Sequence, residues 1–251
     1  MQDITAVKAG LKNLNSCRDK LKSLHNIHKG ETCYILGCGP SLKDYAIEEI
    51  EEVLRDNPTI AIKQAFFTNP ALIDYHIIND NNLMEYPHRD FMDSVIRLVS
   101  CRHEETAKQI SQLAEWDVFT PIEQDTDFSQ ALCNTLDFDK YTFDNQYERP
   151  WGPGLMGELV FFFAYHLGFK NIITLGWDHE QPGTTTSHHF YDHALSSDEL
   201  VNPANKMLPD EIAKNINMSR EWYLWLKKRD VKLSTISKNS HIHEIIPRLT
   251  L

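Results

Sequence analysis

The sequence predicts one α/β domain built on a doubly wound, mostly parallel, Rossmann-like sheet. Short continuous apolar runs, which are typical of strands buried on both faces of a parallel sheet, recur along the chain. Amphipathic helical patterns separate these runs, and such alternation indicates right-handed strand–helix–strand units. A length of 251 residues with 41% hydrophobic residues is sufficient for one substantial core.

The chain begins with a segment that is expected to be helical. Residues 1–29 are predicted to form an N-terminal amphipathic helix, because apolar residues recur at helical spacing from 4 to 24. This extension is a candidate contact for a homo-oligomer. The Rossmann-like domain then occupies 30–251, with its first strand at 32–37 and a surface helix at 42–54.

Further elements follow from the same patterns. Strands are expected at 59–62, 75–78, 95–99, 117–122, 170–175 and 231–236. Helices are expected at 104–115, 155–167 and 211–228, with Gly168 as a left-handed cap and a terminal helical turn at 242–249. Two aperiodic segments, at about 123–151 and, after Gly176-Trp-Asp178, at 181–209, are predicted to be loop insertions of the kind that often carries function.

Composition excludes several classes of protein. A formal net charge of -11, from 36 acidic and 25 basic residues, argues against a general nucleic-acid binder. The longest apolar block, at 159–167, is too short for a transmembrane segment, and the N-terminus lacks a signal-peptide core. The five cysteines show no CxxC spacing, which is typical of a reduced protein, so a cytoplasmic location is expected.

The turn after the first strand is the main candidate for a ligand site. In a doubly wound sheet this turn offers backbone amides and a helix N-terminus to an anion. Gly37 and Gly39, on either side of Cys38, allow close backbone approach, Pro40 suits the first turn of a helix, and Ser41 can cap its amides. Neither GxGxxG nor GxxxxGK[ST] is present, which argues against ordinary dinucleotide and P-loop sites. A tight turn without a ligand is the alternative.

Two motifs give the chain a resemblance to a known family. They are Gly37-Cys-Gly-Pro-Ser-Leu-Lys43, which follows a strand, and His166-Leu-Gly-Phe-Lys-Asn-Ile-Ile-Thr-Leu-Gly-Trp-Asp178. In this order they resemble the bacterial sialyltransferases of glycosyltransferase family 42 and the related MptE-like 6-hydroxymethylpterin diphosphokinase and motility accessory factor proteins. The resemblance extends over most of the chain from Thr32 onward.

The resemblance implies a nucleotide site at the ends of the strands. The family's sialyltransferases hold a cytidine nucleotide with one Asn in the first motif, where this chain has Cys38, and with a second Asn, which Asn79 matches. Their second strand leads into Asn-Gln, and here Lys63-Gln64 keeps only the amide of Gln64. Lys63 would suit a diphosphate donor or would be a solvated strand end.

The resemblance adds a second group of binding residues. Backbone amides at the start of the helix before the second motif face the nucleotide in the family, and Asp178 closes that motif here. The glycines in the corresponding zone of this chain are Gly152, Gly154 and Gly157.

The resemblance also implies where catalysis would occur. The family's sialyltransferases stabilise the departing phosphate with Tyr hydroxyls after the second motif and deprotonate the acceptor with a His. Tyr191, His188 and His189 are predicted to take these roles, because a His near its ordinary pKa of about 6.5 suits proton transfer at neutral pH. Glu211 stands near the family's base position and is the other candidate, although a helix N-terminus more often lowers the pKa of a carboxylate.

The histidine cluster after the second motif also fits other roles. Imidazole and carboxylate groups are common metal ligands, and an exposed or hydrogen-bonded loop is a further alternative. The leading interpretation assigns no metal ligand. The histidines of this cluster are His179, His188, His189 and His193.

Together these observations predict a glycosyltransferase-like enzyme. It would transfer a sugar, of sialic-acid type in the family, from a nucleotide-activated donor such as a CMP-sugar to a hydroxyl of a small-molecule or glycan acceptor, without a further cofactor. The alternative is diphosphate transfer from ATP to a hydroxymethylpterin-type alcohol, with Mg²⁺ held by Asp80 or Asp178. A third alternative is a nucleotide-binding protein of the same fold without catalysis.

Overall fold

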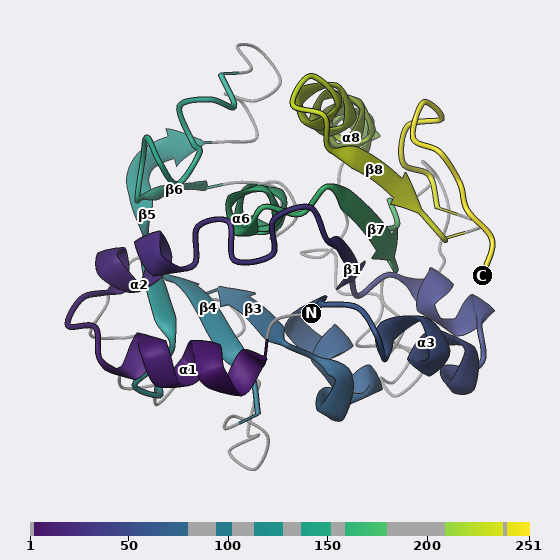
Figure 1. Cartoon of the computed structure of the whole chain (residues 1–251). Coiled ribbons are helices and arrows are strands. Elements are labelled where there is room, and N and C mark those ends of the chain that lie inside the picture. Colours follow the sequence, from purple (N-terminus) through teal and green to yellow (C-terminus); the bar gives the residue numbers. More distant parts are fainter. Residues whose placement is uncertain are drawn as a thin grey trace, which may run out of the picture.

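Eight strands form one parallel sheet in the computed structural model, which describes residues 3–79, 94–101, 113–127, 137–151, 159–179, 209–237 and 240–251 (Figure 1). The strand order is β6-β5-β4-β3-β2-β1-β7-β8, and every described pairing is parallel. The predicted doubly wound α/β sheet is therefore confirmed. The strands are β1 (Thr32–Leu36), β2 (Thr59–Ile62), β3 (Tyr75–Asn79), β4 (Ile96–Cys101), β5 (Val118–Asp127), β6 (Arg149–Trp151), β7 (Asn171–Leu175) and β8 (Lys232–Thr235).

The sheet reverses its direction of growth between β1 and β7. From β1 the chain builds outward through β2 to β6 on one side, and then returns to add β7 and β8 on the other. The register pairs Leu36 with Leu175, so both strands end at the same edge. Ligands of doubly wound sheets bind beyond the carboxyl ends of the strands at such a switch point, which makes this edge the place to look for a site.

Helices cover both faces of the sheet (Figure 1). One face is covered by α1, α2, α6 and α8, whose apolar residues join a single large core with the strands. The other face is covered by α3 and the 3₁₀ turns η1, η2 and η3. Their bounds are α1 (Ile4–Lys12), α2 (Cys17–Ser23), η1 (Pro40–Asp44), α3 (Ile47–Leu54), η2 (Lys63–Thr68), η3 (Pro70–Leu72), α6 (Phe161–Leu167) and α8 (Pro209–Lys227).

Helix α6 is the centre of the larger core. Phe161, Phe162 and Phe163 are fully buried, and the ring of Phe162 lies 4.6 Å from that of Trp222 on α8. The helix ends at Gly168, which has φ 91° and is the left-handed cap that the sequence predicts. A helix that is apolar on all sides is stable only when it is covered on all sides. Here it is covered by the N-terminal segment 3–29, which we call the leader, by α8 and by the sheet.

The N-terminal segment forms two helices where one was predicted. Between α1 and α2 the chain leaves the helix, because Ser16 caps α2 by accepting a hydrogen bond from the amide of Asp19 (3.1 Å). Leu11, Leu21 and Leu24 are buried in the chain's own core. The extension thus packs on the chain's own core, and its role as a contact in a homo-oligomer stays a prediction.

Three further predictions need correction. The helix predicted at 42–54 is split into η1 and α3, since Tyr45 is extended and its hydroxyl donates to the Ile236 carbonyl (2.7 Å). The segment at 123–151 is less irregular than predicted, because β5 continues to Asp127 and β6 pairs with it at the sheet edge. No helical turn forms at 242–249, where Pro247 has no amide to donate and the chain bridges β8 instead.

Buried polar groups join the leader to the amino ends of β4 and β5. Arg97 and Asp117 form an ion pair whose side chains are 3% and 0% exposed. Asp117 also accepts from the amides of Arg97 (2.9 Å) and Ala114 (2.7 Å), while Lys20 of α2 donates to the Asp117 carbonyl (3.2 Å). These bonds pair the charges that burial would otherwise leave isolated.

None of the helices within the described ranges combines the length and the apolar composition that crossing a bilayer requires.

Candidate functional site

The turn after β1 and the turn after β7 lie in direct contact. The Gly39 amide donates to the Gly176 carbonyl (2.8 Å), and a Cβ on Gly37 would come closer than 3.0 Å to that carbonyl oxygen. Gly176 itself has φ 68°, a left-handed conformation that side chains disfavour. Gly37 and Gly39, which were predicted to admit a ligand, are therefore required for the close contact between the turn after β1 and the turn after β7.

Asp178 and Ser41 are joined by two hydrogen bonds at this contact. Asp178 accepts from the Ser41 amide (2.7 Å) and from the Ser41 hydroxyl (2.8 Å). Burial raises the pKa of Asp178 above its ordinary value, and the bonds from Ser41 oppose that rise. The carboxylate of Asp178 thus takes the place of a bound anion, which would otherwise accept a hydrogen bond from the Ser41 amide.

This arrangement corrects the role expected for Ser41. The residue at the N-cap position before η1 is Gly39, which has no side chain to cap the turn, and the Ser41 hydroxyl is directed to Asp178 instead. A Cβ on Gly39 would meet the Asp178 side chain at less than 3.0 Å, so the glycine is what lets the carboxylate approach. The structure brings the predicted residues Gly39, Pro40, Ser41 and Asp178 together, with Ser41 and Asp178 bonded to each other.

Cys38 joins this turn to the end of β2. Its thiol donates to the Ile62 carbonyl (3.2 Å) and lies 3.8 Å from Oε1 of Gln64. Burial raises the pKa of Cys38 to about 11, so the residue is a thiol at neutral pH and a poor nucleophile. Two residues from the predicted binding set, Cys38 and Gln64, are therefore neighbours.

Lys63 holds an unusual backbone conformation at the end of β2. Its φ is 46°, in the left-handed region that residues other than glycine rarely adopt. Its carbonyl lies 2.9 Å from Nε2 of His76, a buried residue whose ring stacks on Phe66 at 4.5 Å. Locally unfavourable conformations that the surrounding fold enforces are common at functional sites, and this one lies where β2 ends and η2 begins.

His179 follows Asp178 at the same edge. Its Nε2 atom is buried and has no hydrogen-bond partner among the described residues. Burial, with a smaller contribution from the nearby His241, lowers the pKa of His179 to about 4, so the ring is neutral at pH 7. A buried nitrogen without a partner is costly unless a ligand or water meets it.

Two serines after β8 were not anticipated from the sequence. The Ser237 hydroxyl accepts from the Gly176 amide (3.0 Å), and the Ser240 hydroxyl donates to the Trp177 carbonyl (2.5 Å). They hold the turn after β7 in place. No motif marks them, because their role depends on the neighbouring position of β7 and β8 in the sheet.

The remaining predicted residues are placed only in part. Asn79 ends β3 at the carboxyl edge and pairs in register with Ser100, and Glu211 lies in the first turn of α8. The side chains of both lie outside the description. The residues that fall wholly outside the described ranges are Asp80, Gly152, Gly154, Gly157, His188, His189, Tyr191 and His193.

A group of three potential metal ligands lies elsewhere within the described ranges. It consists of His25, Asp144 and His166, beside a cavity of about 310 Å³. His25, Asp144 and His166 precede β1, β6 and β7 respectively, so they lie at the amino ends of strands and form no part of the switch-point site.

Comparisons with known proteins support the fold. No protein-family model and no curated protein sequence matches the chain. The MAf glycosyltransferase of Magnetospirillum magneticum AMB-1 superposes with a TM-score of 0.51 and 15% identity over 94% of this chain, which spans only 39% of that protein's length. The sialyltransferase CstII of Campylobacter jejuni, solved with the substrate analogue cytidine-5'-monophosphate, gives a TM-score of 0.51 and 17% identity over 88% of this chain and 85% of its own. The chain therefore has the sialyltransferase-like α/β fold that these two glycosyltransferases share.

Proposed function

We propose that the chain is a glycosyltransferase-like enzyme that moves a sugar from a nucleotide-activated donor to an acceptor hydroxyl. The observation that carries the proposal is the contact between the turns after β1 and β7, at the switch point of a fold that glycosyltransferases use. A cytidine nucleotide is the first donor to test, because CstII was solved with one.

The pairing of Ser41 with Asp178 changes which groups would hold the nucleotide. The Ser41 amide and hydroxyl are directed to Asp178, so they position the turn and do not bind the nucleotide. Other residues at this edge would contact the nucleotide directly. In our proposal the amide of Gln64 faces the nucleotide from η2, and Asn79 does so from the end of β3. Both elements end or begin at the carboxyl edge.

His179 is our candidate for a contact with the departing phosphate. Its ring is neutral at pH 7, and an anion close by would raise its pKa because a negative charge favours the imidazolium form. It could then donate a hydrogen bond as negative charge develops on the leaving group. His188, His189 and Glu211 remain the predicted groups for proton transfer on the acceptor, and Tyr191 remains the predicted donor to the departing phosphate.

Thermal-shift titration tests the nucleotide site. The purified chain is titrated with CMP, UDP, GDP and ATP, each with and without Mg²⁺. We expect CMP, or another nucleoside mono- or diphosphate, to stabilise the protein without Mg²⁺, by about 2.7 kcal/mol at a ligand concentration of 100 Kd. Stabilisation by ATP only with Mg²⁺ would support the diphosphokinase alternative, and no response to any nucleotide would contradict both enzymes.

Two variants locate the site once a ligand is found. Gln64→Ala should weaken nucleotide binding by about fivefold to tenfold, the loss of one hydrogen bond worth about 1–1.5 kcal/mol. Gln146→Ala is the matched control, because Gln146 lies at the amino edge and its amide contacts Glu123 (3.3 Å). Equal affinity of the Gln64 variant and the control would place the nucleotide elsewhere.

A further inference from the structure

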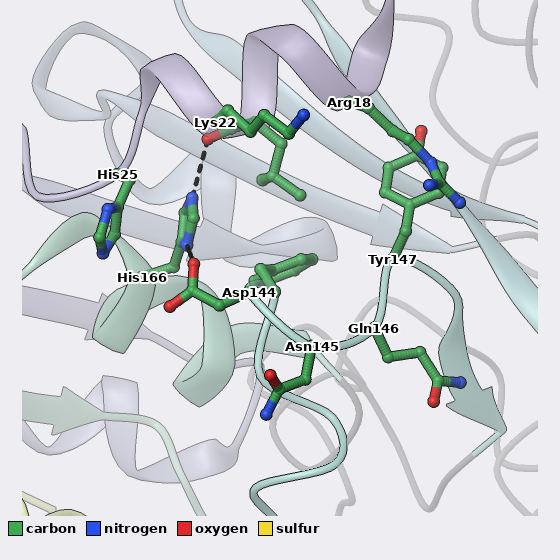
Figure 2. A pocket seen from close by; sticks show the side chains of 10 residues that line it. Arg18, Lys22, His25, Asp144, Asn145, Gln146, Tyr147 and His166 are labelled. Carbon is green, nitrogen blue, oxygen red and sulfur yellow. Dashed lines mark hydrogen bonds and ion pairs between the residues drawn. The ribbon is translucent and has the colours of Figure 1, made fainter.

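Two histidines and an aspartate from three separate segments meet at the amino edge of the sheet (Figure 2). His25 lies between α2 and β1, His166 lies near the end of α6, and Asp144 lies in the segment before β6. One potential ligand atom from each residue lies within 4.8 Å of the other two. Figure 2 shows the two rings side by side, with the carboxylate directed at the edge of His166.

Hydrogen bonding fixes which nitrogen of His166 is available. Its Nε2 lies 2.8 Å from the Leu21 carbonyl, an acceptor only, so Nε2 carries the proton and Nδ1 presents a lone pair. A histidine that binds a metal usually donates its second ring N–H to a carbonyl or carboxylate in this way.

The separation between His166 and Asp144 fits two ligands of one ion. Nδ1 of His166 lies 3.9 Å from Oδ1 of Asp144, which is too long for a hydrogen bond. Zinc bonds of about 2.0–2.2 Å in tetrahedral geometry place two ligand atoms roughly 3.4 Å apart. The ring of the exposed His25 stacks on that of His166 with centroids 5.1 Å apart, and one of its nitrogens lies within 4.8 Å of the ligand atoms of the other two residues.

The neighbouring cavity supplies room for the rest of the coordination shell. All three residues line it, together with Lys22 and Arg18. Arg18 is stacked over Tyr147 (4.7 Å) and lies 3.5 Å from the Glu148 carboxylate, so its charge is already engaged. The carboxylate of Asp144 beside the two rings would repel an anion, and it would attract a cation.

We propose that His25, Asp144 and His166 bind a divalent transition metal ion of the Zn²⁺ class, with water from the cavity at the remaining position. Two imidazole nitrogens and one carboxylate oxygen form a donor set that suits zinc. The ion would join the leader, α6 and the segment before β6, three parts of the chain that no strand pairing connects. It would therefore act as a structural clamp at the edge opposite the nucleotide site, independently of the proposed function.

Metal binding to the purified chain is the direct test. After treatment with a chelator and removal of that chelator, the protein is titrated with Zn²⁺ and with Co²⁺, and bound metal, visible absorption of Co²⁺ and melting temperature are measured. We expect one ion per chain, a ligand-field spectrum of four-coordinate Co²⁺ and a higher melting temperature. Absence of stoichiometric metal under these conditions would overturn the proposal.

Variants at the two exposed ligands assign the site without disturbing the core. His25→Ala and Asp144→Asn should each weaken Zn²⁺ binding by more than about tenfold, while the melting temperature of the metal-free protein stays close to that of the wild type. His243→Ala is the matched control, since His243 lies near the C-terminus and contacts the Ile245 amide. Binding that falls equally in the control, or in neither ligand variant, would overturn the assignment.

A change of charge at the cavity separates a cation from an anion. Lys22→Gln removes a positive charge from the lining, so it should leave Zn²⁺ binding unchanged or make it tighter. If inorganic phosphate in place of Zn²⁺ raises the melting temperature, and Lys22→Gln abolishes that effect, the cavity is an anion site and the metal proposal is wrong.

Discussion

Asp178 accepts hydrogen bonds from both the backbone amide and the hydroxyl of Ser41, at 2.7 Å and 2.8 Å, across 137 positions of sequence. Ser41 lies in the turn after β1 and Asp178 lies in the turn after β7, so their hydrogen bonds join these two turns at the switch point. The Asp178 carboxylate thus accepts the hydrogen bond that the Ser41 amide would otherwise donate to a bound anion at such a turn.

Removing the carboxylate should destabilise the protein measurably. Asp178→Ala leaves the Ser41 amide and hydroxyl without their acceptor, and we expect a loss of about 1–3 kcal/mol in the free energy of unfolding. Urea unfolding of the wild type and the variant measures it. Asp178→Asn should lose less, because its amide oxygen still accepts one of the two bonds.

The coupling between the two residues can be isolated. Ser41→Ala removes only the hydroxyl, and the double variant should lose less than the sum of the single variants, since the residues contact each other. The exposed Asp56 provides a control, and its replacement by Ala should change stability by no more than about 0.5 kcal/mol. Strict additivity of Ser41→Ala and Asp178→Ala would show that the hydroxyl bond contributes nothing.

Cys38 tests whether the donor is a cytidine nucleotide. The sialyltransferases that the chain resembles have Asn at this position, and here the thiol contacts Ile62 and Gln64. If the donor site has kept its cytidine geometry, Cys38→Asn should tighten CMP binding by about tenfold, because an amide adds one hydrogen bond. Calorimetric titration of CMP and UDP into the wild type, Cys38→Asn and Cys38→Ser measures the effect. A gain for UDP alone, or the same gain in Cys38→Ser, would contradict a cytidine site.

Asp74 should make stability depend on pH in a defined direction. Burial and the charge of Glu31 raise the pKa of Asp74 from 3.8 to about 6, against the bond from the Thr59 amide. The folded protein therefore favours the protonated acid. That contribution to stability is complete below about pH 4 and is lost as the pH rises through 6.

Replacing Asp74 by Asn removes this titration while keeping an oxygen for the Thr59 amide (2.9 Å). The free energy of unfolding of Asp74→Asn relative to the wild type should rise between pH 4 and pH 7 by up to about 3 kcal/mol, since each pKa unit corresponds to about 1.4 kcal/mol. Urea unfolding across that range measures it, with the exposed Asp56→Asn as control. A difference that is flat with pH would show that Asp74 titrates normally.

Asp117 should be among the most sensitive positions for stability. Asp117→Ala leaves the guanidinium of Arg97 buried without its counter-charge, and we expect a loss of about 3–5 kcal/mol. Denaturant unfolding measures the effect, and Glu115→Ala on the exposed neighbouring position should cost no more than about 0.5 kcal/mol. If Asp117→Ala and Arg97→Met together restore the stability of the wild type, the loss in the single variant arises from the isolated charge.

The sequence by itself determined seven of the eight described strands and the cap that ends α6. The runs at 59–62 and 170–175 are apolar and rich in β-branched residues, so they form strands buried on both faces, and Gly168 ends α6 because glycine tolerates a positive φ. These features depend on residues that are neighbours in the chain. The order of apolar runs and helices was also sufficient to predict a doubly wound parallel sheet.

Only the tertiary structure decided the chemistry at the sheet edges. Three contacts at these edges join residues that are 61 to 141 positions apart in the sequence. They are the hydrogen bonds between Ser41 and Asp178, the hydrogen bond from the Gly176 amide to Ser237, and the contact between His25 and His166. The break between α1 and α2, and the pairing of β6 with β5, also depend on what the rest of the chain presents. Local propensity contains no information on such contacts, because their free energy comes from burial and hydrogen bonding that exist only after the strands have taken their places in the sheet.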